Sequence, residues 1–305
     1  MCERIATPQR YTSQPTKICE AGSIILSVRA PVGTVGKTFQ KICLGRGVCG
    51  ITSKNIEFMY QYLLNNENSW RHIEQGGTFT AINSDDIKSF PIILPSLPEQ
   101  KKIADFLSLI DQRIEKQRRL VESLKKYKRG ALSRVFNDVL ETVKLSDISN
   151  FISSARTLST TLNGNKGIYP VYDAAGIAGY IDYYDIDSDY ITIVKDGSGV
   201  GRLQKCDKKS SFIGTLGALV AKNCTTDFLY AVLQTIDFSK FVTGMAIPHI
   251  YYRDYKSTLL PFPSEEKQHF ISQLLKKFDI YIENETQKLT NMLAYKQGLL
   301  QQMFI

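Results

Sequence analysis

Residues 95–136 read PSLPEQKKIADFLSLIDQRIEKQRRLVESLKKYKRGALSRVF, and this stretch decides the fold. Ser96, Pro98 and Glu99 form the signature of a helix start, with a capping serine, a proline in the first turn and a glutamate three residues after the serine. Only Gly130 interrupts the helical pattern that follows. Such a helix extends about 57 Å at 1.5 Å per residue, so it must act as a spacer or find a partner.

The same pattern recurs 168 residues later, because residues 88–136 align with residues 256–304 without a gap. Identical residues keep this register at Lys88/Lys256, Ile103/Ile271, Leu107/Leu275, Asp111/Asp279, Ile114/Ile282, Lys128/Lys296, Gly130/Gly298 and Phe136/Phe304. Self-similarity over such a length indicates a duplicated unit, and each copy of the unit ends in a long helix.

Both long segments have the 4,3 spacing of apolar residues that is typical of a coiled-coil seam. The predicted seam comprises Ile103, Leu107, Ile110, Ile114, Gln117, Val121, Leu124 and Lys128, followed by Ile271, Leu275, Phe278, Ile282, Glu285, Leu289, Met292 and Lys296. If the helices pack antiparallel with paired numbers that sum to 413, Lys128 faces Glu285 and Gln117 faces Lys296. The alternative is that each helix packs only on its own globular part.

Short β segments punctuated by glycine precede each long helix, within residues 22–60 and 168–220. Residues 56–65 and 226–236 are predicted short helices. The sequence therefore predicts an α+β fold, in which two domains of mixed short strands and helices are separated by two long helices packed as an antiparallel coiled coil. The predicted boundaries are 1–95, 96–137, 138–262 and 263–305.

The two repeats differ in length, because no segment of the first repeat corresponds to residues 145–167. We therefore expect the first domain to be incomplete at its N-terminal side. Either the missing part is dispensable, or the first domain recognises its ligand less well than the second.

The charge balance favours an anionic partner. The chain has 38 Lys and Arg against 30 Asp and Glu, a net charge of +8, and a pI near 9.0. Most of the excess lies on the first long helix, where it forms either a solvated basic face or a contact surface for phosphates or an acidic protein. Its basic residues are Lys101, Lys102, Arg113, Lys116, Arg118, Arg119, Lys125, Lys126, Lys128, Arg129 and Arg134.

Composition and motifs argue against several kinds of chemistry. The six cysteines form no C-x-x-C pair and the three histidines are not at ligand spacing, which argues against a metal site or a disulfide framework and suits a reducing cytosol. Residues 35–38, VGKT, end like a phosphate-binding loop, but Pro31 stands where the loop needs its first glycine. No apolar run approaches the roughly 20 residues of a membrane span.

Residues 95–114 resemble the conserved start of the spacer helix in the specificity subunit of type I restriction–modification systems, usually called HsdS. Residues 167–182, GIYPVYDAAGIAGYID, resemble the opening of a target-recognition domain of that family, and residues 22–36 look like the interior of another. The resemblance covers nearly the whole chain. It departs at residues 264–268, SEEKQ, which repeat the first helix start only loosely.

The resemblance implies a non-catalytic DNA reader in which residues 1–95 and 138–262 are target-recognition domains, joined by two conserved spacer helices. Each domain would read one half of a bipartite double-stranded DNA target. The implied protein partners are two methyltransferase (M) subunits and restriction/translocase (R) subunits, with no membrane. S-adenosylmethionine, ATP and Mg would bind those partners and not this chain, and the complex would act in the cytoplasm of a bacterium or archaeon.

Contacts to bases and phosphates require basic, amide, hydroxyl or tyrosine side chains on exposed loops. The predicted DNA contacts are Arg29, Lys37, Lys41, Arg46 and Thr80 in the first domain and Lys166, Lys195, Arg202, Lys205, Tyr251 and Arg253 in the second. An alternative is a coiled-coil protein-interaction adaptor without DNA binding, which lacks salt-dependent duplex binding. A third, a P-loop enzyme, would bind nucleotide.

Overall fold

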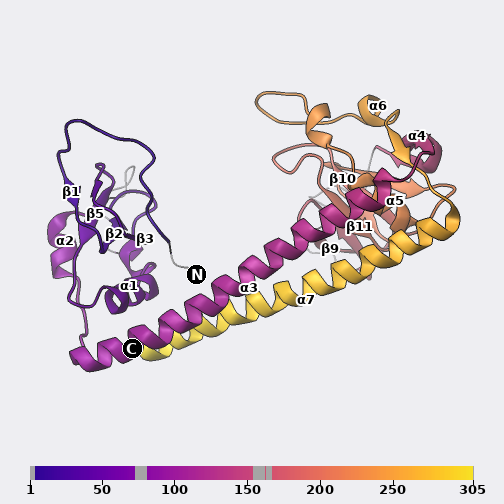
Figure 1. Cartoon of the computed structure of the whole chain (residues 1–305). Helices are drawn as coiled ribbons and strands as arrows, with labels where there is room; N and C mark the ends of the chain where they lie inside the picture. The colour runs from indigo at the N-terminus through magenta and orange to yellow at the C-terminus, as the bar shows by residue number, and fades with distance from the viewer. Residues whose placement is uncertain (1–3, 73–80, 154–161, 163–166, 305) are drawn as a thin grey trace. The chain divides into compact units, whose positions relative to one another are not determined.

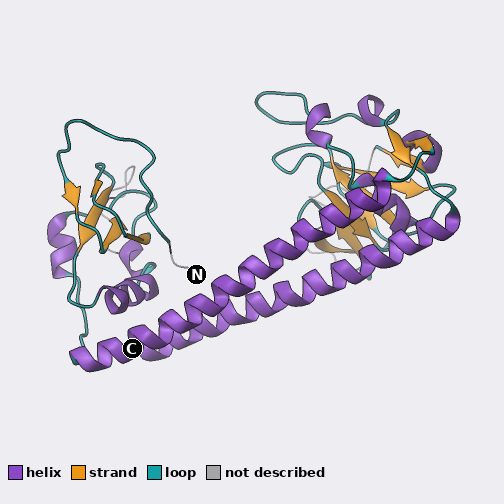
Figure 2. Ribbon diagram, viewed as in Figure 1, coloured by secondary structure: helices purple, strands orange, loops and turns teal. Residues whose placement is uncertain are grey.

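The computed structural model describes residues 4–72, 81–153, 162 and 167–304. The chain forms two compact units: unit 1 comprises Met1–Ser123 and Ile282–Ile305, and unit 2 comprises Leu124–Tyr281. Two long helices, α3 (Leu97–Asn137) and α7 (Glu265–Met303), each contribute to both units (Figure 1). The predicted α+β class, with two mixed domains and two long helices, is confirmed (Figure 2).

Unit 1 is built on a three-stranded antiparallel sheet in the order β3-β2-β5. Asn55 caps the helix that follows this sheet, because its side chain accepts a hydrogen bond from the amide of Phe58. The elements are β1 (Ile18–Cys19), β2 (Ser23–Ser27), β3 (Val35–Thr38), β4 (Ile42–Cys43), β5 (Val48–Ile51), α1 (Ile56–Asn65), a 3-10 helix (Ser69–His72) and α2 (Ser84–Ser89). Ile24, Leu26, Tyr60 and Leu63 form the core between sheet and helix.

Unit 2 contains a four-stranded antiparallel sheet in the order β11-β10-β13-β7, a three-stranded sheet β12-β8-β9 and the pair β14-β6. The strands are β6 (Thr142–Lys144), β7 (Ser149–Ile152), β8 (Tyr169–Tyr172), β9 (Ile177–Ile181), β10 (Tyr190–Val194), β11 (Leu203–Cys206), β12 (Ser211–Phe212), β13 (Leu216–Ala221) and β14 (Leu259–Pro261). The helices are α4 (Leu145–Ile148), α5 (Thr226–Leu233), a 3-10 helix (Phe238–Phe241) and α6 (Tyr252–Tyr255). Helix α5 ends three residues before the predicted limit.

The sheets repeat at the same spacing as the long helices. Strands β3, β2 and β5 of unit 1 correspond to β11, β10 and β13 of unit 2, and both sets pair in the same order. Thr225 caps α5 through the amide of Phe228, as Asn55 caps α1. The duplication predicted from the helices therefore includes the globular parts.

The two long helices lie antiparallel in each unit, held by the same polar contact. In unit 1 the Nζ atom of Lys296 lies 2.6 Å from Oδ1 of Asp111, and in unit 2 Nζ of Lys128 lies 2.6 Å from Oδ1 of Asp279. These two Lys–Asp pairs are equivalent under the 168-residue repeat. Each pair of numbers sums to 407, so the antiparallel packing is confirmed and the predicted register of 413 is wrong.

Gln117 also has a different neighbour from the one predicted. Its Nε2 atom donates to the backbone oxygen and to Oε2 of Glu285, at 2.9 and 2.7 Å. Lys288, and after it Gln117, hold the pKa of Glu285 below its usual range by hydrogen bonding to the carboxylate. This contact therefore stabilises the helix pair at neutral pH, and its contribution is lost as the pH falls through the lowered pKa.

The predicted seam side chains all lie at least partly away from solvent. Leu107, Ile114, Val121, Ile271, Leu275, Glu285 and Lys296 are buried, and Ile103, Ile110, Gln117, Leu124, Lys128, Phe278, Ile282, Leu289 and Met292 are half-buried. Asp111 and Asp279, which bind the seam lysines, lie one position beside the predicted seam.

Each unit joins its helix pair to its globular core through an equivalent aromatic contact. In unit 1 the ring of Phe304 meets Phe58 edge-on at 5.5 Å, and in unit 2 Phe136 meets Phe228 edge-on at 6.3 Å. The paired rings bury large apolar area against the short helices α1 and α5.

Within the described residues, no helix has both the length and the apolar character that a bilayer crossing requires.

The two Lys–Asp pairs differ in burial, which generates a prediction. The side chains of Lys296 and Asp111 are 1% and 11% exposed, whereas those of Lys128 and Asp279 are 12% and 40% exposed. We expect Asp111→Asn to reduce the free energy of unfolding by about 3–5 kcal/mol, because it removes the negative charge beside a buried ammonium. The matched Asp279→Asn should cost about 1 kcal/mol or less, because solvent screens that pair.

Hydrogen exchange of the amides of α3 and α7, combined with denaturant titration, measures both costs. Equal losses of unfolding free energy for the two substitutions would show that burial of the Lys–Asp pair does not determine its contribution to stability.

Candidate nucleic-acid interface

The same end of the repeated sheet carries exposed cationic side chains in each unit. In unit 1 this is the end where β2 stops and β5 starts, with Ser27 opposite Val48. In unit 2 it is the end where β10 stops and β13 starts, with Val194 opposite Leu216. We call this edge of each sheet the loop end.

Arg29 and Arg46 lie at the loop end of unit 1. Arg29 follows β2 and forms a backbone bridge with Ala81, while Arg46 precedes β5. Both side chains are exposed, and among the described residues neither forms an ion pair. Their guanidinium groups are therefore free to bind an anion such as phosphate.

Lys195, Arg202, Tyr251 and Arg253 lie at or beside the loop end of unit 2. Nζ of Lys195 donates to the backbone oxygen of Ser153 at 2.7 Å. Arg202 closes the β10–β11 turn, since its backbone oxygen accepts from Val194 at 2.9 Å. Lys195 is half-buried, whereas Arg202, Tyr251 and Arg253 are exposed. Two exposed guanidinium groups on one edge of a sheet form a surface suited to a polyanion.

Tyr251 and Arg253 act as one stacked group. The guanidinium carbon of Arg253 lies 4.8 Å from the centre of the Tyr251 ring, and Nε of Arg253 lies 3.5 Å from Oδ1 of Asp254. Stacking holds the guanidinium in one plane while its remaining donors face solvent. The amide of Ile250 donates to the backbone oxygen of Lys195 at 3.0 Å, which attaches this segment to the end of β10.

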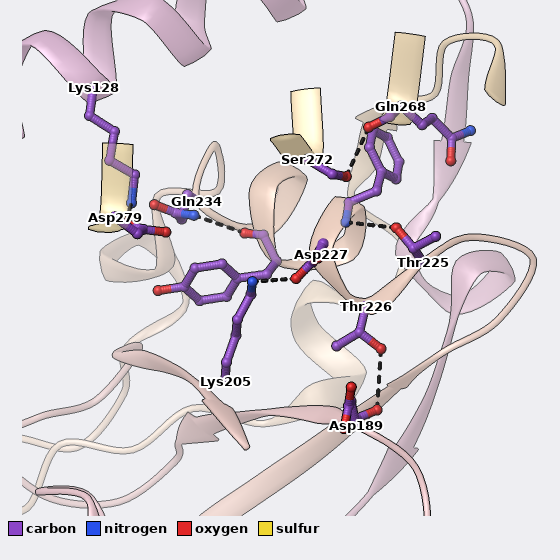
Figure 3. Close-up of polar contacts among 12 residues, drawn as sticks. Lys128, Asp189, Lys205, Thr225, Thr226, Asp227, Gln234, Gln268, Ser272 and Asp279 are labelled. Atoms are coloured by element: carbon purple, nitrogen blue, oxygen red, sulfur yellow. Dashed lines mark hydrogen bonds and ion pairs between the residues drawn. The ribbon is translucent and has the colours of Figure 1, made fainter. Parts of the chain in front are cut away.

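Two predicted contact residues, Lys37 and Lys205, instead brace each sheet against its short helix. Lys37 is 3% exposed, and its Nζ atom lies 2.6 Å from Glu57 and 4.8 Å from the ring centre of Tyr60. In unit 2, Lys205 pairs with Asp227 and lies over Tyr230 in the same way (Figure 3). Burial of Lys37 corrects its choice as a DNA contact, and the pairing of Lys205 makes that residue a poor candidate.

Of the three remaining predicted contacts, the structure describes only Lys41, which does not lie at a loop end. Lys41 is exposed, follows β3 at the opposite end of the sheet, and lies 2.8 Å from Glu20. Thr80 and Lys166 lie outside the described residues. The DNA-contacting role of Thr80 and Lys166 stays a prediction.

Sequence reasoning missed the loop Thr243–His249, which attaches directly to the loop end of unit 2. The amide of Gly197 donates to the backbone oxygen of Pro248 at 2.9 Å. The His249 ring packs edge-on against Tyr251 at 4.9 Å. The signal that could have found this loop is its run of apolar residues after Gly244, in a segment that also contains histidine and tyrosine.

The groups in question for chemistry are metal ligands, cysteine thiols and residues 35–38. No group of three or more His, Cys, Asp or Glu in the described ranges could hold a metal ion. Burial raises the pKa of the Cys206 and Cys224 thiols to about 11, so both are protonated at neutral pH. Residues 35–38 form strand β3, with Lys37 facing Glu57, and do not form a phosphate-binding loop.

A protein-family model matches both repeated units of the chain. The family described as "Type I restriction modification DNA specificity domain" matches residues 6–125 and 137–293. The chain belongs to this family. Both matches include one repeated sheet and a large part of one long helix.

Curated relatives carry the same family's names. The specificity subunit of the type I restriction enzyme MjaX of Methanocaldococcus jannaschii is 39% identical over 130 residues, which cover 41% of this chain and 31% of the relative. The specificity subunit of the type I restriction enzyme EcoprrI of Escherichia coli is 23% identical over 292 residues, or 86% of this chain and 72% of the relative. The chain thus matches only about a third of the first relative's length.

Solved structures of specificity subunits share the fold. The S subunit of a type I restriction–modification system from M. genitalium has a TM-score of 0.61 and 18% identity, covering 99% of this chain and 88% of that chain. A chain from a study of complex assembly and conformational transition in the type I system has a TM-score of 0.58 and 18% identity, covering 97% and 85%.

Proposed function

We propose that this chain is the non-catalytic subunit that gives a type I restriction–modification complex its DNA sequence specificity. Each loop end reads one half of a bipartite double-stranded target, and residues 1–95 and 138–262 are the two target-recognition domains. The observation that carries this proposal is the presence of cations at the same sheet edge of two repeated units: the exposed Arg29 and Arg46 in one, and the half-buried Lys195 with the exposed Arg202 in the other.

The charge distribution supports duplex DNA as the ligand. The chain has a net charge of +8, and phosphate contacts by lysine and arginine supply most of the affinity in protein–DNA complexes. Because the exposed cations sit on loops at strand ends, they can reach base edges as well as phosphates. A guanidinium stacked on tyrosine, as in Arg253 and Tyr251, is held ready for a planar contact.

We infer that the helix pair docks two methyltransferase subunits, one on each unit, and that restriction/translocase subunits complete the complex. Tyr127 in unit 2 and Tyr295 in unit 1 are equivalent under the repeat, precede the seam lysines Lys128 and Lys296, and are 67% and 63% exposed. Two equivalent exposed tyrosines suit two copies of one partner, because tyrosine is enriched in protein interfaces. S-adenosylmethionine, ATP and Mg then bind the partners.

The salt dependence of binding tests the DNA-reading role. In the complex of the full chain with its host's methyltransferase subunits, Arg202→Ala should weaken binding to target and non-target duplexes alike. It should also reduce the slope of log affinity against log salt by about 0.9, as expected for one lost phosphate contact. Lys41→Ala, at the opposite sheet end, is the matched control and should leave the slope unchanged.

Fluorescence anisotropy titrations at several salt concentrations measure these slopes. If the wild-type complex binds no duplex, the chain is a protein-interaction adaptor and the DNA-reading proposal fails. Methylome sequencing of the host with and without the gene should show one bipartite methylated sequence that disappears with it. Substitution of a residue that reads a base should relax a single position of that sequence.

The docking role makes a separate prediction about stoichiometry. Native mass spectrometry should find two methyltransferase subunits per wild-type chain, and one per chain for either Tyr127→Ala or Tyr295→Ala, because each variant weakens one of two equivalent surfaces. Tyr281→Ala is the control, since Tyr281 is 48% exposed on α7 and its repeat equivalent is Arg113. Retention of both partners in the Tyr127→Ala Tyr295→Ala double variant would show that docking uses another surface.

A further inference from the structure

The loop Thr243–His249 of unit 2 is a rigid hairpin-like projection. The amides of Thr243 and His249 each donate to the other residue's backbone oxygen at 2.8 Å. Gly244 has a φ of +88°, and a Cβ atom there would lie 2.4 Å from the backbone oxygen of Ile247. Only glycine fits this turn, so the path of the loop is fixed by its own backbone.

The base of this loop is attached to the loop end of the sheet. Pro248 accepts from the amide of Gly197 at 2.9 Å, and the amide of Ile250 donates to the oxygen of Lys195 at 3.0 Å. His249 forms a backbone bridge with Asp196. The loop therefore extends from the same edge that carries the exposed cations of unit 2.

The tip of the loop exposes apolar side chains that the rest of unit 2 does not cover. Met245 is 106% exposed and Ile247 is 66% exposed. Large apolar side chains held in water on a turn contribute nothing to the stability of unit 2, whereas a partner that buries them gains free energy from the apolar area removed from water. Because the backbone is already ordered, little entropy is lost on binding.

The surroundings of the tip favour a polyanion over an apolar protein surface. Beside the base of the loop stand Lys195, the Arg253 guanidinium stacked on Tyr251, and the His249 ring. Two carboxylates, Asp196 and Asp254, lie in the same stretch, and Asp254 is engaged by Arg253. Apolar residues at a tip, with cations at its base, match the wedges of Met, Ile and Pro that DNA-binding proteins insert between base steps.

We propose that Met245 and Ile247 form an apolar wedge that inserts at one base step of the half-site bound by unit 2. This inference rests on the proposed DNA-reading function and specifies how one unit reads its site. The side chains enter the groove and unstack one step, while Lys195 and Arg253 contact the flanking phosphates. The step that unstacks at least cost is then preferred, which makes the loop a determinant of sequence preference.

The test uses the full chain assembled with its host's methyltransferase subunits. The DNA is a duplex that contains the target sequence identified by methylome sequencing. 2-Aminopurine is placed at successive positions of the half-site, because its fluorescence rises when it is unstacked. The wild-type complex should raise the fluorescence several-fold at one position. The Met245→Ala Ile247→Ala double variant should abolish that rise and weaken target binding about 10- to 100-fold, with the salt slope unchanged.

Two further variants of unit 2 serve as controls. Leu259→Ala removes another side chain of unit 2 that is 61% exposed and should change neither signal. Gly244→Ala should lower the fluorescence rise with both apolar side chains still present. Salt-dependent target binding without any fluorescence rise in the wild type would overturn the wedge and leave the proposed function standing. Loss of methyltransferase assembly in the double variant would assign the loop to a protein contact instead.

Discussion

The antiparallel helix packing depends on a Lys–Asp contact that the chain makes twice, buried in unit 1 and partly exposed in unit 2. Lys296 contacts Asp111 in unit 1, and Lys128 contacts Asp279 in unit 2, each at 2.6 Å. A buried ammonium without its carboxylate is so costly that a shifted register would be strongly destabilised, whereas apolar seam residues tolerate a shift more easily. In unit 1, Nε2 of Gln61 also donates to Asp111 at 2.7 Å, so α1 is tied to the same contact.

The repeated contacts continue outward from the helices to the proposed DNA-binding edge. Phe304 on Phe58 and Phe136 on Phe228 join each helix pair to its short helix. A strand lysine, Lys37 in unit 1 and Lys205 in unit 2, joins the sheet to the short helix. Its ammonium group pairs with a carboxylate of that helix and lies over a tyrosine ring of the same helix. Each sheet is thereby held in the same way on its own helices. None of these contacts involves the cationic side chains of the loop ends, where the two units differ in sequence.

The helix limits, the duplication and the fold class followed from local patterns, because capping residues, apolar spacing and a gapless repeat are all visible in the sequence. The register did not follow, since a heptad pattern on both helices permits several alignments and the deciding residues, Asp111 and Asp279, lie beside the apolar seam. Lys37 was misplaced because a strand lysine gives no local sign of burial. The loop Thr243–His249 was missed because exposure of Met245 depends on tertiary contacts.

A charge-exchange cycle in unit 1 tests the central claim most directly. The variants are Asp111→Lys, Lys296→Asp and the double exchange, and the measured quantity is the free energy of opening of the α3 and α7 amides by hydrogen exchange. The account predicts that each single variant loses about 3–5 kcal/mol and that the double exchange recovers much of the combined loss. A double variant that loses the sum of the two single losses would show that these residues do not fix the register.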